Sequence, residues 1–316
     1  SSTALRQFEG SRVLMIHPAR CLFRAGGTPK KFIDRLLSDS HIKIIRYFPN
    51  ASEVFENIDL KGGVAITYRD TNRFFGAVKV YIPFPELRAI FHKVTTRKDF
   101  KPLTEIMRGV GIFHYTEQLH VENPTAASRM SKTHEYDVKT NALENFPDIF
   151  LDDKPNDDRE YIKMWGLVRM ERVCKWIRRD YILDIPLLHV YKVMIPKAYG
   201  GAGALRENGP TMLVGLPLVG YTDSFIGVYK LDSAAEADNC LKYIKTKFAR
   251  TLLGVLKVTQ HATPPKWKYV PQQDFSAGSD VPWEKPVAQI DEYLYGKYGL
   301  SAAEVAFIES NVKAMN

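Results

Sequence analysis

Two glycine-containing stretches have the residue types of phosphate-binding loops. In SRVLMIHPARCLFRAGGTPKKF (residues 11–32), an apolar run precedes two glycines and two lysines. A P-loop needs GxxxxGK followed by Ser or Thr, whereas Thr28 and Pro29 follow Gly27 here. Proline also removes a backbone amide that an anion would contact. The second stretch, GGAGAL (residues 200–205), lacks GxGxxG spacing and predicts a turn or a flexible binding loop.

Basic side chains carry a stronger signal, and they gather in two stretches. The first stretch, residues 161–182, contains Arg172, Lys175, Arg178 and Arg179, interleaved with Trp165, Trp176 and Tyr181. The second stretch contains Lys242, Lys245, Lys247 and Arg250. Basic faces of this kind neutralise nucleic-acid phosphates, but a solvated face opposite a core stripe has the same composition. We favour the solvated face for the second stretch, and both interpretations stay open for the first.

Carboxylates and histidines form no recognisable catalytic or metal-binding motif. The nearest approach to a PD-(D/E)xK nuclease pattern is Asp148 with Glu160 and Lys163, but two residues separate Glu160 from Lys163 instead of one. The acidic stretch around them is typical of a solvated loop. His114 and His120 are too far apart for the HExxH pattern. The sequence therefore predicts no metal site.

The composition of the chain limits the classes of protein to which it can belong. The chain has 316 residues and a net charge of +8, an excess that fits a nucleic-acid partner. Its three cysteines lie far apart and form no CxxC pair, which favours a reducing, cytoplasmic location over a disulfide framework. No apolar run approaches the length of a bilayer span, so no membrane partner is expected.

The elements that position these residues fall into two segments. In residues 1–95, apolar runs predict strands at residues 13–16, 42–47, 64–68 and 76–82, with a helix that Thr28 caps. This alternation of strands with a helix indicates part of an α/β sheet.

The second segment, residues 96–316, has a mixed α+β pattern. Apolar residues at three- and four-residue spacing predict a long amphipathic helix over residues 161–182 and another over 233–258. Between them lies a strand-rich region, and residues 267–275 predict one more strand. The last predicted helix begins at Ser301, with Glu304 completing a capping box.

Two parts of the sequence resemble a known family. RVLMIHPARCLF (residues 12–23) and IRYFPNASEVFENIDLKGGVAITY (residues 45–68) resemble the end of the catalytic domain of gamma-class adenine-specific DNA methyltransferases in type II restriction-modification systems. KYIKTKFARTLLGVLKVTQ (residues 242–260) and WKYVPQQDF (residues 267–275) resemble the target recognition domain of that family. The resemblance implies a partial methyltransferase-type sheet in residues 1–95 and a target recognition domain in residues 96–316.

The family's cofactor and catalytic motifs are absent from the sequence. That family binds S-adenosylmethionine through an FxGxG-like loop and holds adenine with (N/D)PP(Y/F), but Asn123 and Pro124 are followed by neither a second proline nor an aromatic residue. The chain alone is therefore expected neither to methylate nor to cut DNA. S-adenosylmethionine is expected only for the complete enzyme, whose N-terminal methyltransferase half would be a partner.

Three interpretations remain open for the function. The chain is a DNA-recognising portion of an adenine methyltransferase and restriction enzyme, which positions duplex DNA for methyl transfer to a flipped adenine. Alternatively, it is a stand-alone specificity subunit that borrows catalysis from a partner chain. The third interpretation is an unrelated basic enzyme.

Candidate site residues follow from the basic stretches and from the resemblance. Residues expected to bind duplex DNA are Arg172, Lys175, Arg179, Lys197, Tyr199 and Arg206. The resemblance implies that Phe55, in a Val-Phe pair before a β-branched strand, stacks on the flipped adenine. We expect its ring to be partly exposed and to face a cleft between the two segments, although a core phenylalanine is the alternative.

Overall fold

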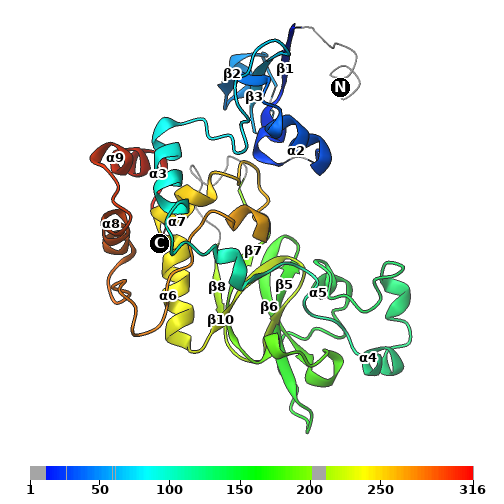
Figure 1. Cartoon of the computed structure of the whole chain (residues 1–316). Coiled ribbons are helices and arrows are strands. Elements are labelled where there is room, and N and C mark those ends of the chain that lie inside the picture. The colour runs from blue at the N-terminus through cyan, green and yellow to red at the C-terminus, as the bar shows by residue number, and fades with distance from the viewer. Residues whose placement is uncertain (1–11, 26, 59, 61, 201–210, 316) are drawn as a thin grey trace.

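The computed structural model describes residues 12–25, 27–58, 60, 62–200 and 211–315 (Figure 1). The strands are β1 (Arg12–Pro18), β2 (Ile42–Phe48), β3 (Val64–Asp70), β4 (Met107–Arg108), β5 (Tyr161–Val168), β6 (Glu171–Arg178), β7 (Tyr191–Pro196), β8 (Leu213–Gly215), β9 (Val219–Tyr221) and β10 (Phe225–Leu231). The α-helices are α2 (Lys30–Ser38), α3 (Pro85–Thr95), α4 (Glu117–Glu122), α5 (Ala142–Asn145), α6 (Ala234–Lys245), α7 (Lys247–Leu253), α8 (Val287–Lys297) and α9 (Ala302–Asn311). In these residues the chain forms a mixed α/β fold with sheets in the orders β1-β3-β2, β4-β10-β7-β8 and β6-β5-β9.

The first sheet contains three of the strands predicted near the N-terminus, so residues 13–16, 42–47 and 64–68 do share one sheet. Strand β3 lies in the middle and pairs antiparallel with both β1 and β2. Helix α2 covers one face, where Leu36 and Leu37 pack in one core with Ala65 of β3. The sheet is therefore small and antiparallel, and a single helix covers one side of it.

The fourth strand predicted for this segment, at residues 76–82, is wrong. These residues form turns and irregular structure. Lys79 has a φ of 55°, which takes the backbone out of the extended region, and its amide donates to the carbonyl oxygen of Leu37 at the end of α2. The apolar side chains of the segment cover the small core instead, with Val78 and Tyr81 packed against it.

Helix α3, Val258 and one lysine take part in the connection between the first segment and the rest of the molecule, and Val258 packs against the core of the first sheet. Helix α3 packs against α7 and α9, and its Ile90 and Val94 are fully buried in the large core of the C-terminal segment. The Lys266 ammonium donates to the carbonyl oxygen of Arg24 at 2.9 Å, across the boundary between the two units. Burial lowers the pKa of Lys266 to about 8.

The second sheet lies against a layer of helices. Helix α6 packs on β7, β8 and β10, and α8 and α9 lie beyond α6 and α7 (Figure 1). The helix predicted over residues 233–258 is interrupted at Thr246, whose ψ of 146° ends α6, and the Thr246 hydroxyl then accepts the Ala249 amide as the N-cap of α7. The capping box of Ser301 and Glu304 is confirmed at the start of α9.

The long helix predicted over residues 161–182 is wrong, because this stretch folds as the antiparallel β5–β6 hairpin. Val, Ile, Trp and Tyr side chains favour strands, and here they pack on a core in the pleated, alternating pattern of a sheet. Met170, one of the apolar residues in that stretch, is 85% exposed at the turn of the hairpin. Strand β9 pairs with the other edge of β5 in parallel.

The strand predicted at residues 267–275 is also wrong. A 3-10 helix spans Pro264–Trp267, and irregular structure follows it. Pro271 interrupts the segment, because proline has no amide hydrogen to donate to a sheet. The Trp267 side chain is fully buried, and its indole nitrogen donates to the carbonyl oxygen of Ala262 at 2.9 Å.

Candidate nucleic-acid interface

The β5–β6 hairpin gathers basic and aromatic side chains on one face. In its register Lys163 lies opposite Trp176, Trp165 opposite Cys174 and Leu167 opposite Arg172. Residues directly opposite each other in a ladder project to the same side, and every second residue of a strand joins them. Tyr161 and the buried Arg178 project to this side at the far end of the hairpin. We call the remaining six residues the outward face: Lys163, Trp165, Leu167, Arg172, Cys174 and Trp176. Within this face, Trp165 is partly buried against the core. The alternate residues Ile162, Met164 and Ile177 are buried.

Two cations of the outward face are available to bind an anion. The Lys163 ammonium lies 4.9 Å from the centre of the Trp176 ring, in the arrangement of a cation–π contact. Arg172 is exposed, and within the described parts of the chain no carboxylate pairs with it. Partial burial by its neighbours lowers the pKa of Arg172. The outward face thus combines unneutralised charge with ring surface, which is what a nucleic-acid backbone and its bases require.

Three other basic residues of the same stretch, Lys175, Arg178 and Arg179, are neutralised by ion pairs. Lys175 pairs with Asp152, and Arg179 pairs with Asp184. Arg178 is buried between Glu122 of α4 and Asp180, and its hydrogen bonds are the main cause that lowers the pKa of Glu122 to about 2. The structure therefore separates Arg172 from Lys175 and Arg179, although the sequence grouped them on one helical face.

Lys197 and Tyr199 lie together in the segment that follows β7. The Lys197 ammonium donates to the hydroxyl of Thr140 at 3.1 Å, and the Tyr199 ring lies 4.1 Å from the ammonium of the buried Lys257. Both residues are half-buried. Arg206 lies outside the described residues.

Phe55 follows a short 3-10 turn in the connection between β2 and β3. Its ring is 41% exposed, so it is not an interior core residue. The turn is held by the Asn50 side chain, which accepts the Ser52 amide at 3.2 Å, and by the Phe55 amide, which donates to the carbonyl oxygen of Ala51. Stacking on a flipped adenine and a position facing a cleft stay predictions.

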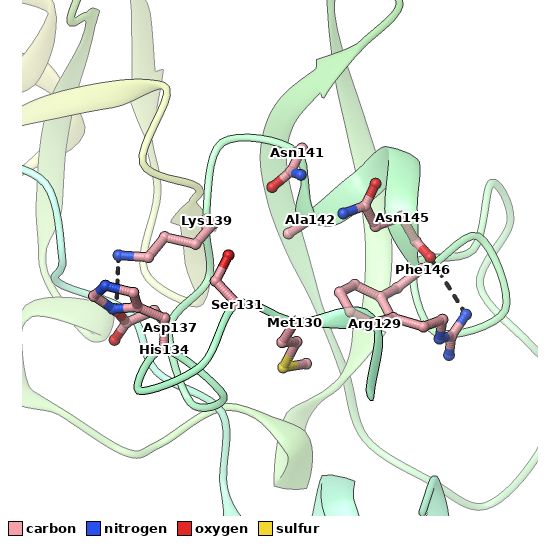
Figure 2. Close-up of a pocket in the computed structure, with 10 residues that line it drawn as sticks. All are labelled: Arg129, Met130, Ser131, His134, Asp137, Lys139, Asn141, Ala142, Asn145 and Phe146. Carbon is pink, nitrogen blue, oxygen red and sulfur yellow. Dashed lines mark hydrogen bonds and ion pairs between the residues drawn. The ribbon is translucent and has the colours of Figure 1, made fainter. Parts of the chain in front are cut away.

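A polar hollow beside α5 is too small to be a substrate site. Figure 2 shows Asn141 and Asn145 on one side of it and the group of His134, Asp137 and Lys139 on the other. Its volume is about 40 Å³, whereas small-molecule pockets hold roughly 300–1,000 Å³. The charges also satisfy each other, because Asp137 accepts from Lys139 at 2.7 Å and this bond is the main cause that lowers the pKa of Asp137.

The second basic stretch borders a larger open cavity of about 820 Å³ between α6, α7 and α8. Two of the four lysines that line the cavity are engaged: Lys242 donates to the carbonyl oxygen of Trp283 at 2.5 Å, and Lys247 pairs with Glu309. Three carboxylates also line it: Asp238, Glu284 and Asp291. Arg250 is only 3% exposed and donates to the carbonyl oxygen of Lys313. Three of the four basic residues of the stretch, Lys242, Lys247 and Arg250, thus bind groups of the protein itself.

Metal-binding groups and membrane-spanning helices can be assessed for the described part of the chain. No group of three His, Cys, Asp or Glu side chains there is arranged to hold a metal ion. No helix there combines the length and the apolar character needed to cross a lipid bilayer.

Sequence reasoning missed Lys163 and the tip residues Arg169 and Met170. The signal for Lys163 was present as the alternation of Lys163, Trp165 and Leu167, which has the period of a strand. The turn had no such signal, because Arg-Met lacks the Asn or Gly that marks a two-residue hairpin turn.

Comparison of the sequence with models of protein families gives no match, and comparison with curated proteins gives none either.

Proposed function

We propose that this chain binds duplex DNA and that the outward face of the β5–β6 hairpin contacts the phosphate backbone. The observation that carries the proposal is Arg172, an exposed guanidinium without a carboxylate partner in the described residues. It lies on the same face of the hairpin as the Lys163–Trp176 pair, with the Trp165–Cys174 pair between them. Guanidinium groups bind phosphate oxygens in a planar, bidentate geometry. The net charge of +8 supports the same partner over longer range.

We further propose that the chain is the DNA-recognising portion of an adenine-specific DNA methyltransferase of a restriction-modification system. The sequence resemblance is the basis, and one feature of the first sheet supports it. Leu14 and Ile16 are 64% and 53% exposed on the face opposite α2, and among the described strands β1 and β2 each pair only with β3. An apolar sheet face with free edges favours association with another folded unit.

In this proposal a methyltransferase half, on the same polypeptide or on a partner chain, covers the face around Leu14 and Ile16. That half supplies the site for S-adenosylmethionine and the acceptors for the adenine amino group, because the sequence of this chain has neither motif. The chain itself supplies DNA contacts and the orientation of the duplex.

Fluorescence anisotropy with a labelled mixed-sequence duplex of 30 base pairs tests DNA binding. We expect Arg172→Ala to weaken binding and to reduce the slope of log K against log salt by about 0.9, the value for one lost phosphate contact. Lys175→Ala is the matched control on the same strand, because Asp152 already neutralises Lys175 and we expect a smaller change. If Arg172→Ala binds like the parent chain at every salt concentration, the outward face is not the DNA-binding surface.

A further inference from the structure

The tip of the β5–β6 hairpin has an unusual backbone for its residue types. Val168 pairs with Glu171, so the turn consists of Arg169 and Met170 alone. Their φ angles are 48° and 69°, the positive values of a type I′ turn, which strongly favours Asn-Gly. Side chains with a Cβ are disfavoured at such angles.

No packing contact explains why methionine occupies this position. Met170 is 85% exposed, the most exposed of the large apolar side chains in the described residues. The strands that carry it are firmly anchored, because Val168 and Val173 pack against the core beneath the hairpin. Disfavoured backbone angles persist where a site needs them, and here a rigid hairpin presents an apolar tip to the solvent.

The charges around the tip favour an anionic partner, because two arginines outnumber the one carboxylate of Glu171. Arg169 and Arg172 flank Met170 and Glu171 in the sequence, both are exposed, and no carboxylate pairs with either of them in the described residues. Phosphates flank every base step of a duplex, and proteins that unstack DNA insert apolar side chains, methionine among them, between base pairs. Methionine is flexible and polarisable, which suits contact with base faces.

We propose that Met170 is a wedge that enters duplex DNA at a base step, while Arg169 and Arg172 bind the phosphates on either side. This proposal rests on the proposed DNA-binding function and adds to it the element that opens the base stack. The turn holds the wedge at a defined angle, and the outward face of the hairpin lies against the backbone.

A duplex with a central abasic site tests the wedge, since a gap in the stack removes most of the cost of insertion. Anisotropy is measured with a mixed-sequence duplex of 30 base pairs and with the same duplex containing the abasic site. We expect the wild-type chain to prefer the abasic duplex by about tenfold, which corresponds to part of the unstacking cost of one base step. Met170→Ala should lose most of this preference.

Two further variants separate the wedge from general DNA binding. Arg172→Ala should weaken binding to both duplexes equally and keep the preference, because a phosphate contact is made on each. The double variant Arg169→Asn with Met170→Gly supplies the favoured turn residues, so it should raise the melting temperature by about 2 °C or more and lose the preference. Because it also removes the Arg169 phosphate contact, it should weaken binding to both duplexes as Arg172→Ala does, and only the loss of preference reports on the wedge.

The possible failures are distinguishable. Binding of neither duplex by the wild-type chain refutes the DNA-binding function and the wedge together. Binding without preference, or an undiminished preference in Met170→Ala, refutes the wedge alone and leaves DNA binding in place.

Discussion

Replacing Lys192 with methionine tests how the hairpin is held in the fold. Lys192 lies on β7, has no exposed surface, and donates to the carbonyl oxygens of Val219, Leu216 and Leu188 at 2.9, 3.3 and 3.4 Å. Val219 is on β9, which pairs with Lys163 of β5. The buried ammonium therefore connects the second sheet to the strand that supports the outward face.

The magnitude follows from the pKa of Lys192, which burial lowers from 10.5 to about 8. Because the folded-state pKa lies below the unfolded-state pKa, the unfolded chain holds this proton more tightly. The contribution of Lys192 to the unfolding free energy is lowest below pH 8, rises as the folded state loses the proton, and levels off above pH 10.5. At about 1.36 kcal/mol per pKa unit, the contribution of Lys192 to the unfolding free energy rises by about 2.5 kcal/mol between pH 7 and pH 10. This value is an upper limit, because the three carbonyl oxygens stabilise the ammonium in the folded state.

Urea unfolding of the wild type and of Lys192→Met at pH 7, 8, 9 and 10 measures this rise. The difference in unfolding free energy between the two proteins cancels the titration of the buried tyrosines that both share. We expect the unfolding free energy of the wild type, relative to that of Lys192→Met, to rise by about 2 kcal/mol between pH 7 and pH 10. A difference that stays constant or falls with pH would show that the ammonium is not desolvated as its burial indicates. Circular dichroism of the methionine variant checks that it is folded.

Two further predictions concern the proposed complete enzyme. In an enzyme that contains this segment, Phe55→Ala should weaken binding to a duplex with an abasic or flipped target by roughly 1–3 kcal/mol, because one base loses its stacking partner. Binding to intact duplex should weaken less. Equal weakening of binding to both duplexes would contradict the adenine-pocket role. The chain by itself, incubated with duplex and methyl-labelled S-adenosylmethionine, should transfer no label to adenine, and transfer would reveal a cofactor site that its motifs do not indicate.

Local signals in the sequence determined several elements. Three short apolar runs bounded by turn residues predicted the strands of the first sheet, although β1 has no buried residue. Ser301 and Glu304 predicted the start of α9, since their reciprocal hydrogen bonds involve only neighbouring residues. Apolar runs between turn residues also predicted the strand-rich region between residues 190 and 231.

The tertiary structure decided the conformation and the charge state of the candidate site. Apolar residues in 161–182 satisfy both a helical and a strand spacing, and the choice depends on the core beneath β5 and on the pairing with β9. Whether a basic residue is free also depends on distant carboxylates: Asp152 neutralises Lys175 from 23 residues away, and Glu122 reaches Arg178 from 56 residues away. Periodicity and composition are local properties, whereas ion pairing and burial are contacts between segments, so only the folded chain distinguishes Arg172 from its neighbours.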